Sequence, residues 1–209
     1  MNENYSLGLA VFDFLPTIAF LVGAFFLVRI GRVCRGSKCG RMVMAGGLLI
    51  FLGGFLKALW KTLFVTGIAD IQWMSQGQFV FTSTGFLAIC VAMIYMVRGS
   101  KLPASTAALP AMAVWKIPFL FVLTVCSLGA EGILAYIAFK RKAYVAAAGF
   151  VIGVLVILAM AMLSSATQSL TMQWVEEITN TLGQMGFMTG CILLYRNFKA
   201  YGCIAKCGA

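Results

Sequence analysis

The sequence predicts an all-α, polytopic transmembrane helix bundle, and three observations lead to that prediction. The first is composition: 62% of the 209 residues are hydrophobic and the mean hydropathy is +0.97, whereas a soluble domain is about 45–50% apolar. The second is length, because several apolar stretches exceed the roughly 18–20 residues that span a bilayer. The third is an internal repeat, in which the segment Ile71–Cys90 recurs as Met172–Cys191.

Six long apolar segments are expected to form one helix each. They cover residues 8–30, 42–67, 77–97, 118–139, 143–165 and 175–195. The connections between them are short, so residues 1–209 are expected to form a single transmembrane domain. The first segment lacks the basic start and the small-residue cleavage site of a signal peptide, so we expect no cleavable leader.

The positions of the basic residues bear on the number of crossings. With six crossings, seven basic residues would lie on one side of the membrane and six on the other, against the positive-inside rule. A seventh crossing between Lys101 and Lys116 places all thirteen on one side. They are Arg29, Arg32, Arg35, Lys38, Arg41, Arg98, Lys101, Lys140, Arg141, Lys142, Arg196, Lys199 and Lys206. The opposite side then receives five acids, Glu3, Asp13, Asp70, Glu176 and Glu177.

The predicted linker helix would be short. The segment Leu102–Trp115 contains Pro103 and Pro110. At 1.5 Å per residue it would span only about 21 Å, less than the roughly 30 Å of the hydrocarbon core. We therefore expect it to be partly unwound and buried among other helices, away from lipid.

The repeat extends along the whole chain. The segments DFLP (Asp13–Pro16) and WKIP (Trp115–Pro118) each begin an apolar segment that ends in basic residues. Each unit is therefore expected to hold three helices, with repeat one at 8–98, a linker at 99–115, repeat two at 116–198 and a basic, cysteine-containing tail at 199–209. A linker helix makes the two units parallel, and the charge distribution favours this seven-helix 3+1+3 arrangement. The alternative is six helices arranged as 3+3 inverted repeats.

Repeated units around a site near the midplane are a common plan of secondary transporters. The 3+1+3 arrangement resembles, in architecture over the whole chain, the broad superfamily of SWEET sugar transporters, PQ-loop proteins, nicotinamide riboside transporters and opsin-like seven-helix proteins. The resemblance does not extend to motifs, because the chain contains no Pro-Gln dipeptide. A retinal pigment is excluded, since an opsin needs a lysine in its last helix and residues 175–195 contain none.

Polar residues on the last apolar segment are the first candidates for substrate binding. On a helix, Glu177, Asn180, Thr181 and Gln184 fall at i, i+3, i+4 and i+7, on one face. A polar stripe in an apolar helix faces the bundle or a water-filled cavity, because lipid cannot satisfy it. We expect the stripe to line an outward-opening site; the alternative is that it supplies interhelical hydrogen bonds. Gln76 and Gln78 lie near the equivalent place in the first copy, which is polar but uncharged.

One lysine, Lys57, and two tryptophans complete the candidate substrate site. Lys57 and Lys61 are spaced i, i+4 in GGFLKALWK. Lys57 lies deeper and is predicted to pair with Glu177 or to meet an anionic group of a ligand, whereas Lys61 is expected to reach the outer interface. Trp73 and Trp174 begin matching helices, and they are either interface anchors or a stacking platform for a ring-bearing ligand.

Glu131 is the acid that lies far from the outer side. It falls about 20 Å past Pro118 along a helix, within the hydrocarbon region. An ionisable residue at that depth is a functional candidate, and we predict a proton-coupling role for it. The alternative is a neutral, hydrogen-bonded structural glutamate. Gly129 and Gly132 beside it would allow close approach of a neighbouring helix.

The same sequence argues against several other classes of function. The formal charge of +10 does not indicate nucleic-acid binding, because the basic residues flank apolar segments instead of forming a soluble basic face. The chain has no histidine, which removes histidine bases and ligands. The spacings of CRGSKC and CIAKC are poor zinc patterns. We therefore predict no metal site, no cofactor, no catalytic residue and no enzyme activity.

The function predicted from the sequence is a small integral membrane transporter or facilitator for a small polar solute. It would work by alternating access between the two three-helix repeats, with possible proton coupling. The alternatives are a non-transporting sensor, receptor or accessory subunit, or an ion channel if the repeats are inverted. The expected partners are a small-molecule substrate and the lipid bilayer, with a homodimer allowed by the small-residue faces. The expected location is the plasma (inner) membrane, multi-pass, with the N-terminus outside and the C-terminus in the cytoplasm.

Overall fold

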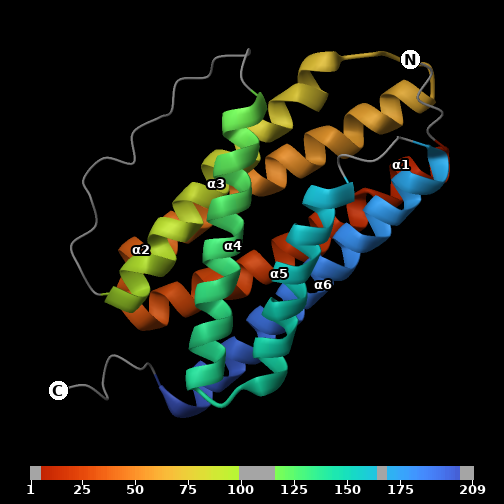
Figure 1. Ribbon diagram of the computed structural model, residues 1–209. Helices are drawn as coiled ribbons and strands as arrows, with labels where there is room; N and C mark the ends of the chain where they lie inside the picture. Colours follow the sequence, from red (N-terminus) through yellow and green to blue (C-terminus); the bar gives the residue numbers. More distant parts are fainter. Residues whose placement is uncertain (1–5, 99–115, 164–168, 203–209) are drawn as a thin grey trace.

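The computed structural model describes residues 6–98, 116–163 and 169–202, and these residues form helices joined by short turns, with no strand among them. One short helix and five long ones follow each other along the chain (Figure 1). They are α1 (Leu7–Phe12), α2 (Phe14–Val65), α3 (Gln72–Arg98), α4 (Lys116–Lys140), α5 (Tyr144–Leu163) and α6 (Leu170–Tyr201). The predicted all-α class is confirmed.

Helix α2 is a hairpin of two arms that joins the first two predicted segments. The chain turns at Gly36, whose φ of +78° lies in the left-handed region that favours glycine. The first arm (14–35) and the second arm (37–65) then run side by side in opposite directions. Their contact is close, because a Cβ on Gly47 would lie 3.1 Å from the Cβ of Ala24.

The bundle has the dimensions and surface of a membrane-embedded protein. Among the described residues, four helical stretches are long and apolar enough to cross a membrane, namely Leu7–Val65, Gln72–Arg98, Phe119–Lys140 and Tyr144–Leu163. The first of these is the α1–α2 unit, and its two arms are each long enough to span a bilayer. Large apolar side chains point outward, such as Phe121 at 69% and Met162 at 79% exposure. Helix α6 is less apolar because it carries polar residues on its buried face.

Contacts between helices give their directions. Along the second arm of α2, Gly46 lies against Gly85 and Gly53 against Gln78, so α3 runs antiparallel to that arm. Helix α6 runs antiparallel to α5, since Gly149 meets Gly186 and Val156 meets Gly183.

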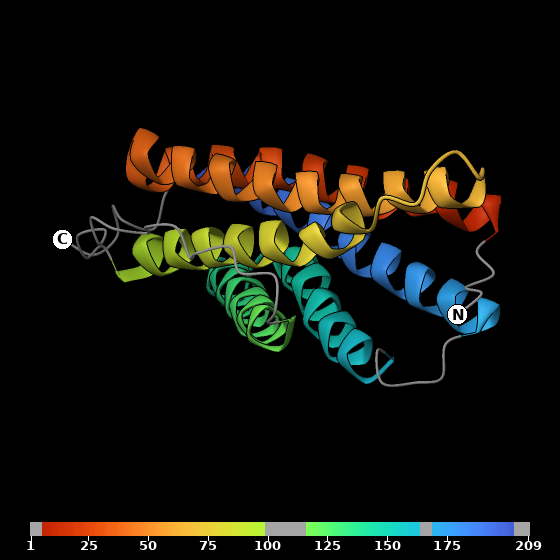
Figure 2. The same ribbon diagram turned by 90° about the horizontal axis from the view of Figure 1, so that it is seen from above.

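Two further helix pairs run parallel. Phe12 contacts Trp174 and Phe26 contacts Tyr195, so α6 is parallel to the first arm of α2. Cys90 lies at Gly129, and residues 94–98 share a groove with residues 128–136, so α4 is parallel to α3. The first arm, α3, α4 and α6 therefore point one way, and the second arm and α5 point the other way (Figures 1 and 2).

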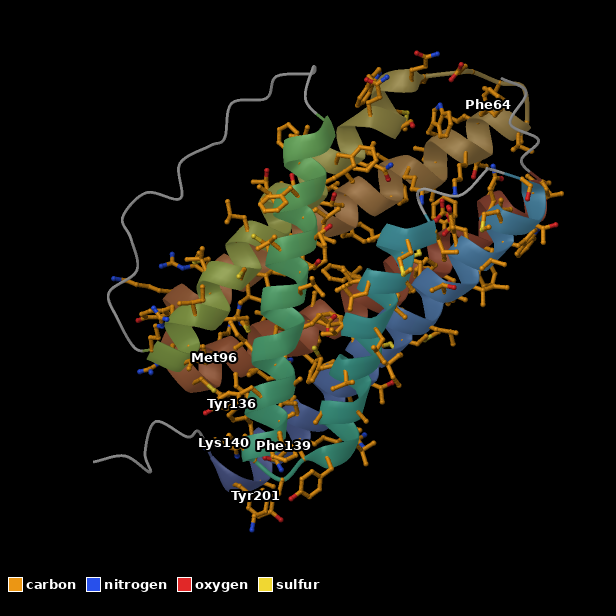
Figure 3. All side chains as sticks on the ribbon, in the orientation of Figure 1. Phe64, Met96, Tyr136, Phe139, Lys140 and Tyr201 are labelled. Atoms are coloured by element: carbon orange, nitrogen blue, oxygen red, sulfur yellow. The ribbon has the colours of Figure 1, made fainter. Side chains whose placement is uncertain are left out.

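These directions gather the basic residues at one end of the bundle, here named the basic end. It holds the α2 turn, the C-terminal ends of α3 and α6, and the α4–α5 turn. Figure 3 shows Met96, Tyr136, Lys140 and Tyr201 near this end and Phe64 near the opposite end. Of the thirteen basic residues expected on one side, all lie here except Lys101 and Lys206, which are outside the described residues. The opposite end, here named the acidic end, holds Asp13, Asp70, Glu176 and Glu177.

The predicted seventh helix is not confirmed. It falls on residues 99–115, which lie outside the described residues. Helix α3 ends at the basic end and α4 begins at the acidic end (Figure 1). The directions of the described helices are those of parallel units.

Helix packing repeats at the spacing that the sequence shows. In the first half, a Cβ on Gly46 would lie 2.7 Å from the carbonyl oxygen of Gly85. In the second half, a Cβ on Gly149 would lie 2.6 Å from the carbonyl oxygen of Gly186. Gly85 and Gly186 are 101 positions apart. The two halves therefore use corresponding glycine pairs to bring their second and third helices together.

Arginines at the basic end repeat in the same way. Arg35 Nε donates to the carbonyl oxygen of Met96 at 3.2 Å. Arg141 donates to Asn197, through Nε to the side-chain oxygen at 2.7 Å and through Nη2 to the carbonyl oxygen at 3.5 Å. Met96 and Asn197 are also 101 positions apart. A cation near the last carbonyls of a helix is favourable. In each half, an arginine from the turn between the first and second helices therefore stabilises the C-terminal end of the third helix.

A cysteine pair offers a test of the parallel packing of α3 on α4. The thiols of Cys90 and Cys126 are within hydrogen-bonding reach of each other across these helices. Mild oxidation of the purified chain should therefore link the two halves covalently. With a protease site inserted between residues 99 and 115, the cleaved halves should stay together on a non-reducing gel and separate after reduction. The Cys126→Ser variant should separate under both conditions, and separation of the oxidised parent chain would contradict this packing.

Candidate functional site

A buried group of four charged residues lies at the acidic end, and we name it the charged cluster. It consists of Asp13, Lys57, Lys61 and Glu177. Asp13 comes from the break between α1 and α2, the two lysines come from the second arm of α2, and Glu177 comes from α6. The cluster therefore joins the first half of the chain to the second.

Each lysine contacts both acids. Lys61 Nζ lies 2.9 Å from Asp13 Oδ2 and 2.5 Å from Glu177 Oε1. Lys57 Nζ lies 3.2 Å from Glu177 Oε1 and 3.9 Å from Asp13 Oδ1. The side chains of Asp13, Lys61 and Glu177 are at most 6% exposed, whereas that of Lys57 is 28% exposed. Lys57 is therefore the least buried member of the cluster.

The charges balance, but the hydrogen bonding is incomplete. Two lysines face two carboxylates, so the net charge of the cluster is zero when all four are ionised. Asp13 Oδ2 and Glu177 Oε2 are buried without a hydrogen-bond partner among the described residues. The approach of Lys61 to Asp13 Oδ2 is close in distance but lacks hydrogen-bond geometry, so we treat it as an ion pair only. Buried acceptors without donors are costly, and the cluster thus holds capacity for an additional donor.

Local sequence explains how these side chains converge. Lys57 and Lys61 are one turn apart and share a face of the second arm. Asp13 sits at the break before Pro16, whose missing N–H is tolerated near a helix start. On α6, Gln173, Glu177 and Thr181 repeat every four residues and are all buried. The Thr181 hydroxyl donates to the carbonyl oxygen of Glu177 at 2.7 Å, so it needs no partner from another helix.

Two of the predicted substrate residues are brought together. Glu177 and Lys57 form the pair that the sequence suggested. Trp174 packs on Phe12 with ring centroids 5.7 Å apart, beside Asp13.

The other predicted residues lie farther from the charges. Asn180 and Gln184 are half-buried, and no hydrogen bond of their side chains is found among the described residues. Of the predicted stripe, Glu177 and Thr181 are therefore buried, and Gln173, which was not predicted, extends the buried polar line in place of Asn180 and Gln184. On α3, Gln76 and Trp73 are exposed, and Gln78 is half-buried where the helix meets Gly53.

Sequence reasoning missed two members of the cluster. Lys61 was expected to reach the outer interface, but it is buried because both acids surround its ammonium group. Asp13 was expected at the outer start of a helix, and it does begin α2, but its burial and its pairing with Lys61 were not predicted. The signal that could have found both is the pairing of their charges, since a lysine pair on so apolar a helix needs acids nearby.

Glu131 lies in a separate buried position within the second half. It is 7% exposed and its Oε2 has no hydrogen-bond partner among the described residues. A Cβ on Gly153 would lie 2.7 Å from that oxygen, so glycine on α5 makes the room for the carboxyl group. The glycines on its own helix act differently from expectation, because Gly129 packs on Cys90 but Gly132 meets no atom within 4 Å.

Phenylalanines fill the interior between the charged cluster and the basic end. Phe20 of the first arm stacks on Phe187 of α6 with centroids 5.4 Å apart and contacts Phe86 of α3 at 6.2 Å. Phe86 and Phe187 are 101 positions apart, so one side chain contacts the corresponding residue of both halves. Phe150 also contacts Phe187. The middle of the bundle is closed by aromatic rings in this conformation.

Among the described residues no group of three or more cysteines and acids could hold a metal ion. Comparison with protein-family models, with curated proteins and with solved structures finds no match for this chain. The functional argument therefore depends on the geometry alone.

Proposed function

We propose that this protein is a small membrane transporter or facilitator for a small polar solute. The observation that carries the proposal is the charged cluster, because its ion pairs connect α1–α2 of the first half to α6 of the second. Ionisable residues buried in a membrane bundle are costly, and they mark solute or ion pathways. Two halves with corresponding packing and a polar contact between them suit a carrier whose halves move against each other.

The arrangement supports a particular closed state. The ion pairs close the acidic end, and the phenylalanines around Phe20 close the middle. Breaking the pairs between Lys57, Lys61 and Glu177 would let the halves separate at the acidic end. A solute with its own charged groups could replace those partners, and Lys57 is the least buried member of the cluster. A solute carrying both an amino and an acidic group would match the two signs present.

Glu131 is proposed as the proton-coupling residue. It lies at Gly153, between the points where α5 meets Gly183 and Gly186 of α6, so it is about 9–14 Å from Glu177 along the bundle. No described cation compensates Glu131, and a buried carboxyl without a cation favours its neutral form. Movement that exposes Glu131 to water would allow it to release its proton, which couples proton movement to the change of conformation.

Membrane orientation and the number of crossings belong to the same proposal. The basic end is proposed to face the cytoplasm by the positive-inside rule, which places the charged cluster outside. Residues 99–115 are proposed to cross the membrane as the linker of a 3+1+3 arrangement, since the ends they connect lie at opposite ends of the bundle. The N-terminus is then outside and the C-terminus inside, in the plasma (inner) membrane. A homodimer stays a prediction from sequence.

The activity is tested by solute flux into vesicles that contain only the purified chain. A panel of labelled amino acids, sugars, amines and small organic acids is offered to the parent chain, to Lys57→Met and to Lys199→Met. Lys199 is an exposed lysine at the basic end and is the matched control. Saturable uptake by the parent and the control, with at least a tenfold loss in Lys57→Met, is the expected result. Uptake unaffected by Lys57→Met would place the pathway elsewhere.

Proton coupling is tested with Glu131→Gln in the same vesicles. This variant keeps the size of the side chain but cannot carry a proton. We expect it to retain exchange of the solute at equal concentrations and to lose accumulation driven by a pH gradient. Accumulation equal to that of the parent would show that Glu131 is structural.

The sensor or accessory-subunit alternative has no observation in its favour among the described residues. The channel alternative depended on inverted units, whereas α4, α5 and α6 have the same sequence of directions as the two arms of α2 and α3. A channel would show solute flux that does not saturate as the solute concentration rises, and the flux measurement would detect this.

A further inference from the structure

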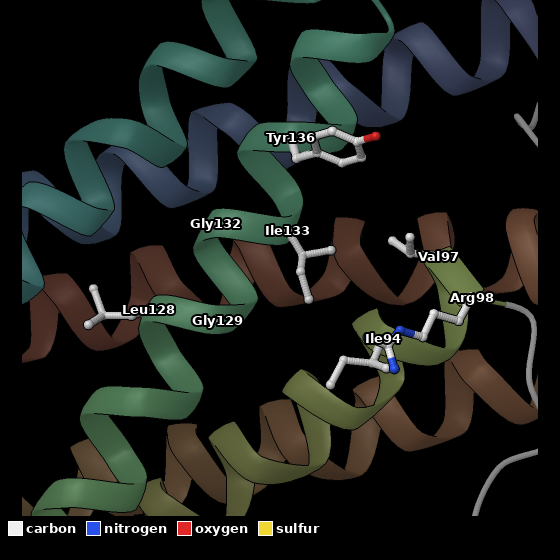
Figure 4. A pocket seen from close by; sticks show the side chains of 8 residues that line it. All are labelled: Ile94, Val97, Arg98, Leu128, Gly129, Gly132, Ile133 and Tyr136. Carbon is white, nitrogen blue, oxygen red and sulfur yellow. The ribbon is translucent and has the colours of Figure 1, made fainter.

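A groove separates α3 from α4 at the basic end, away from the charged cluster (Figure 4). Its volume is about 380 Å³, within the range of small-molecule sites in proteins. The walls are apolar and include Ile94, Val97, Leu128 and Ile133. Along α4 the groove extends from residue 136 to residue 128, about 12 Å toward the middle of the bundle.

The groove exists because α3 and α4 are in contact at Gly129 and diverge from there toward the basic end. At Gly129 the helices are in contact, since a Cβ there would lie 3.2 Å from Cys90 Sγ. One turn nearer the basic end, Gly132 is exposed and a Cβ there would meet no atom within 4 Å. The space beside Gly132 is therefore open to the surroundings of the bundle.

The end of the groove nearest the basic end is cationic. Arg98 lines it, is exposed, and makes no hydrogen bond or ion pair with another described residue. Tyr136 lines the same end, and the ammonium group of Lys140 lies 5.7 Å from the centre of its ring. A guanidinium group is well suited to binding phosphate oxygens. The groove thus has a cationic mouth and an apolar interior.

We propose that this groove binds an anionic phospholipid. The headgroup phosphate would lie against Arg98 near Lys140, and one acyl chain would lie along the apolar walls past Gly132. Charge complementarity selects the occupant, because the mouth carries two cations and no described acid. Basic pockets between transmembrane helices on the cytoplasmic side are suited to anionic headgroups. The inference depends on membrane embedding and not on the transport activity proposed above.

The test uses the full chain, purified in an uncharged detergent and freed of lipid. Thermal unfolding and native mass spectrometry are recorded with phosphatidylglycerol, with phosphatidylcholine and with inorganic phosphate. The variants are Arg98→Gln, which removes the cation from the groove, and Gly132→Leu, which fills the groove at a site with free space. Arg41→Gln is the matched control, because Arg41 is exposed at the same end but does not line the groove.

We expect phosphatidylglycerol to bind the parent and the control and to raise their unfolding temperatures, and phosphatidylcholine and inorganic phosphate to have little effect. Arg98→Gln should weaken phosphatidylglycerol binding about fivefold, which is the contribution that one cation makes to the binding of anionic lipid. Gly132→Leu should fold normally and lose the bound lipid. Equal binding of both lipids by the parent would overturn the proposal. So would instability of Gly132→Leu without lipid, since another part of the chain or a second copy would then fill the groove.

Discussion

Replacing Glu177 with glutamine is expected to lower the free energy of unfolding by about 3–5 kcal/mol, the cost of breaking a buried ion pair by removing one partner. Glu177 Oε1 contacts both Lys57 and Lys61. Without this carboxylate, Asp13 alone faces two lysines, and the buried ammonium of Lys61 loses its nearest acid. Chemical unfolding in detergent micelles measures the change. Asp70→Asn is the matched control, because Asp70 is an exposed acid at the same end that accepts from Trp60 and makes none of the four ion pairs of the cluster.

The double variant Glu177→Gln/Lys61→Met distinguishes ion pairing from a general effect of substitution. It leaves one lysine and one acid, so the cluster is again neutral. If the ion pairs act as described, the double variant should be more stable than Glu177→Gln alone, with a coupling energy of at least about 1 kcal/mol between the two sites. Additive losses would mean that the two side chains do not interact.

Alanine at Gly149 is expected to destabilise the chain by about 1–3 kcal/mol, as added atoms do in a close-packed contact. The new Cβ would lie 2.6 Å from the carbonyl oxygen of Gly186, and backbone cannot rotate away as a side chain can. The sign of the change in stability distinguishes a close helix contact from an exposed position, because alanine in an exposed helix is more favourable than glycine by about 1 kcal/mol.

Three comparisons make this prediction specific. Gly46→Ala should show a similar loss, because Gly46 meets Gly85 in the corresponding way. Gly132→Ala should be neutral or stabilising, because nothing lies within 4 Å of its Cβ. Thermal unfolding in detergent measures all three. Equal stabilisation by all three variants would show that the helices do not approach as closely as described.

The bundle was predictable because apolar length and charge position are properties of the sequence alone. The two apolar segments that form the arms of α2 can be recognised from the sequence. So can the gathering of basic residues at one end and the correspondence of Gly85 with Gly186. The pairing of Lys57 with Glu177 was also predictable, since a charge deep in an apolar segment needs an opposite charge.

The other contacts of the site depend on the orientation of each helix about its own axis and on the residues at which each helix begins and ends. Whether Lys61 reaches water or turns inward depends on the position of Asp13, which belongs to a different helix. The space for the Glu131 carboxyl group likewise comes from Gly153 on α5 and not from the glycines beside Glu131 on α4. Such contacts join residues that are distant along the chain, and helical periodicity gives no information about them.

The central claim is that the interior below the charged cluster opens to each side of the membrane in turn. Thr181 tests it most directly, since it is buried on the same face of α6 as Glu177 and one turn further in. Thr181→Cys, in a chain whose seven cysteines are replaced by serine or alanine, is reconstituted in vesicles of both orientations and treated with a membrane-impermeant maleimide. We predict labelling from both sides, at rates that change in opposite directions when a transported solute is added. Labelling from one side only, under every condition, would contradict alternating access.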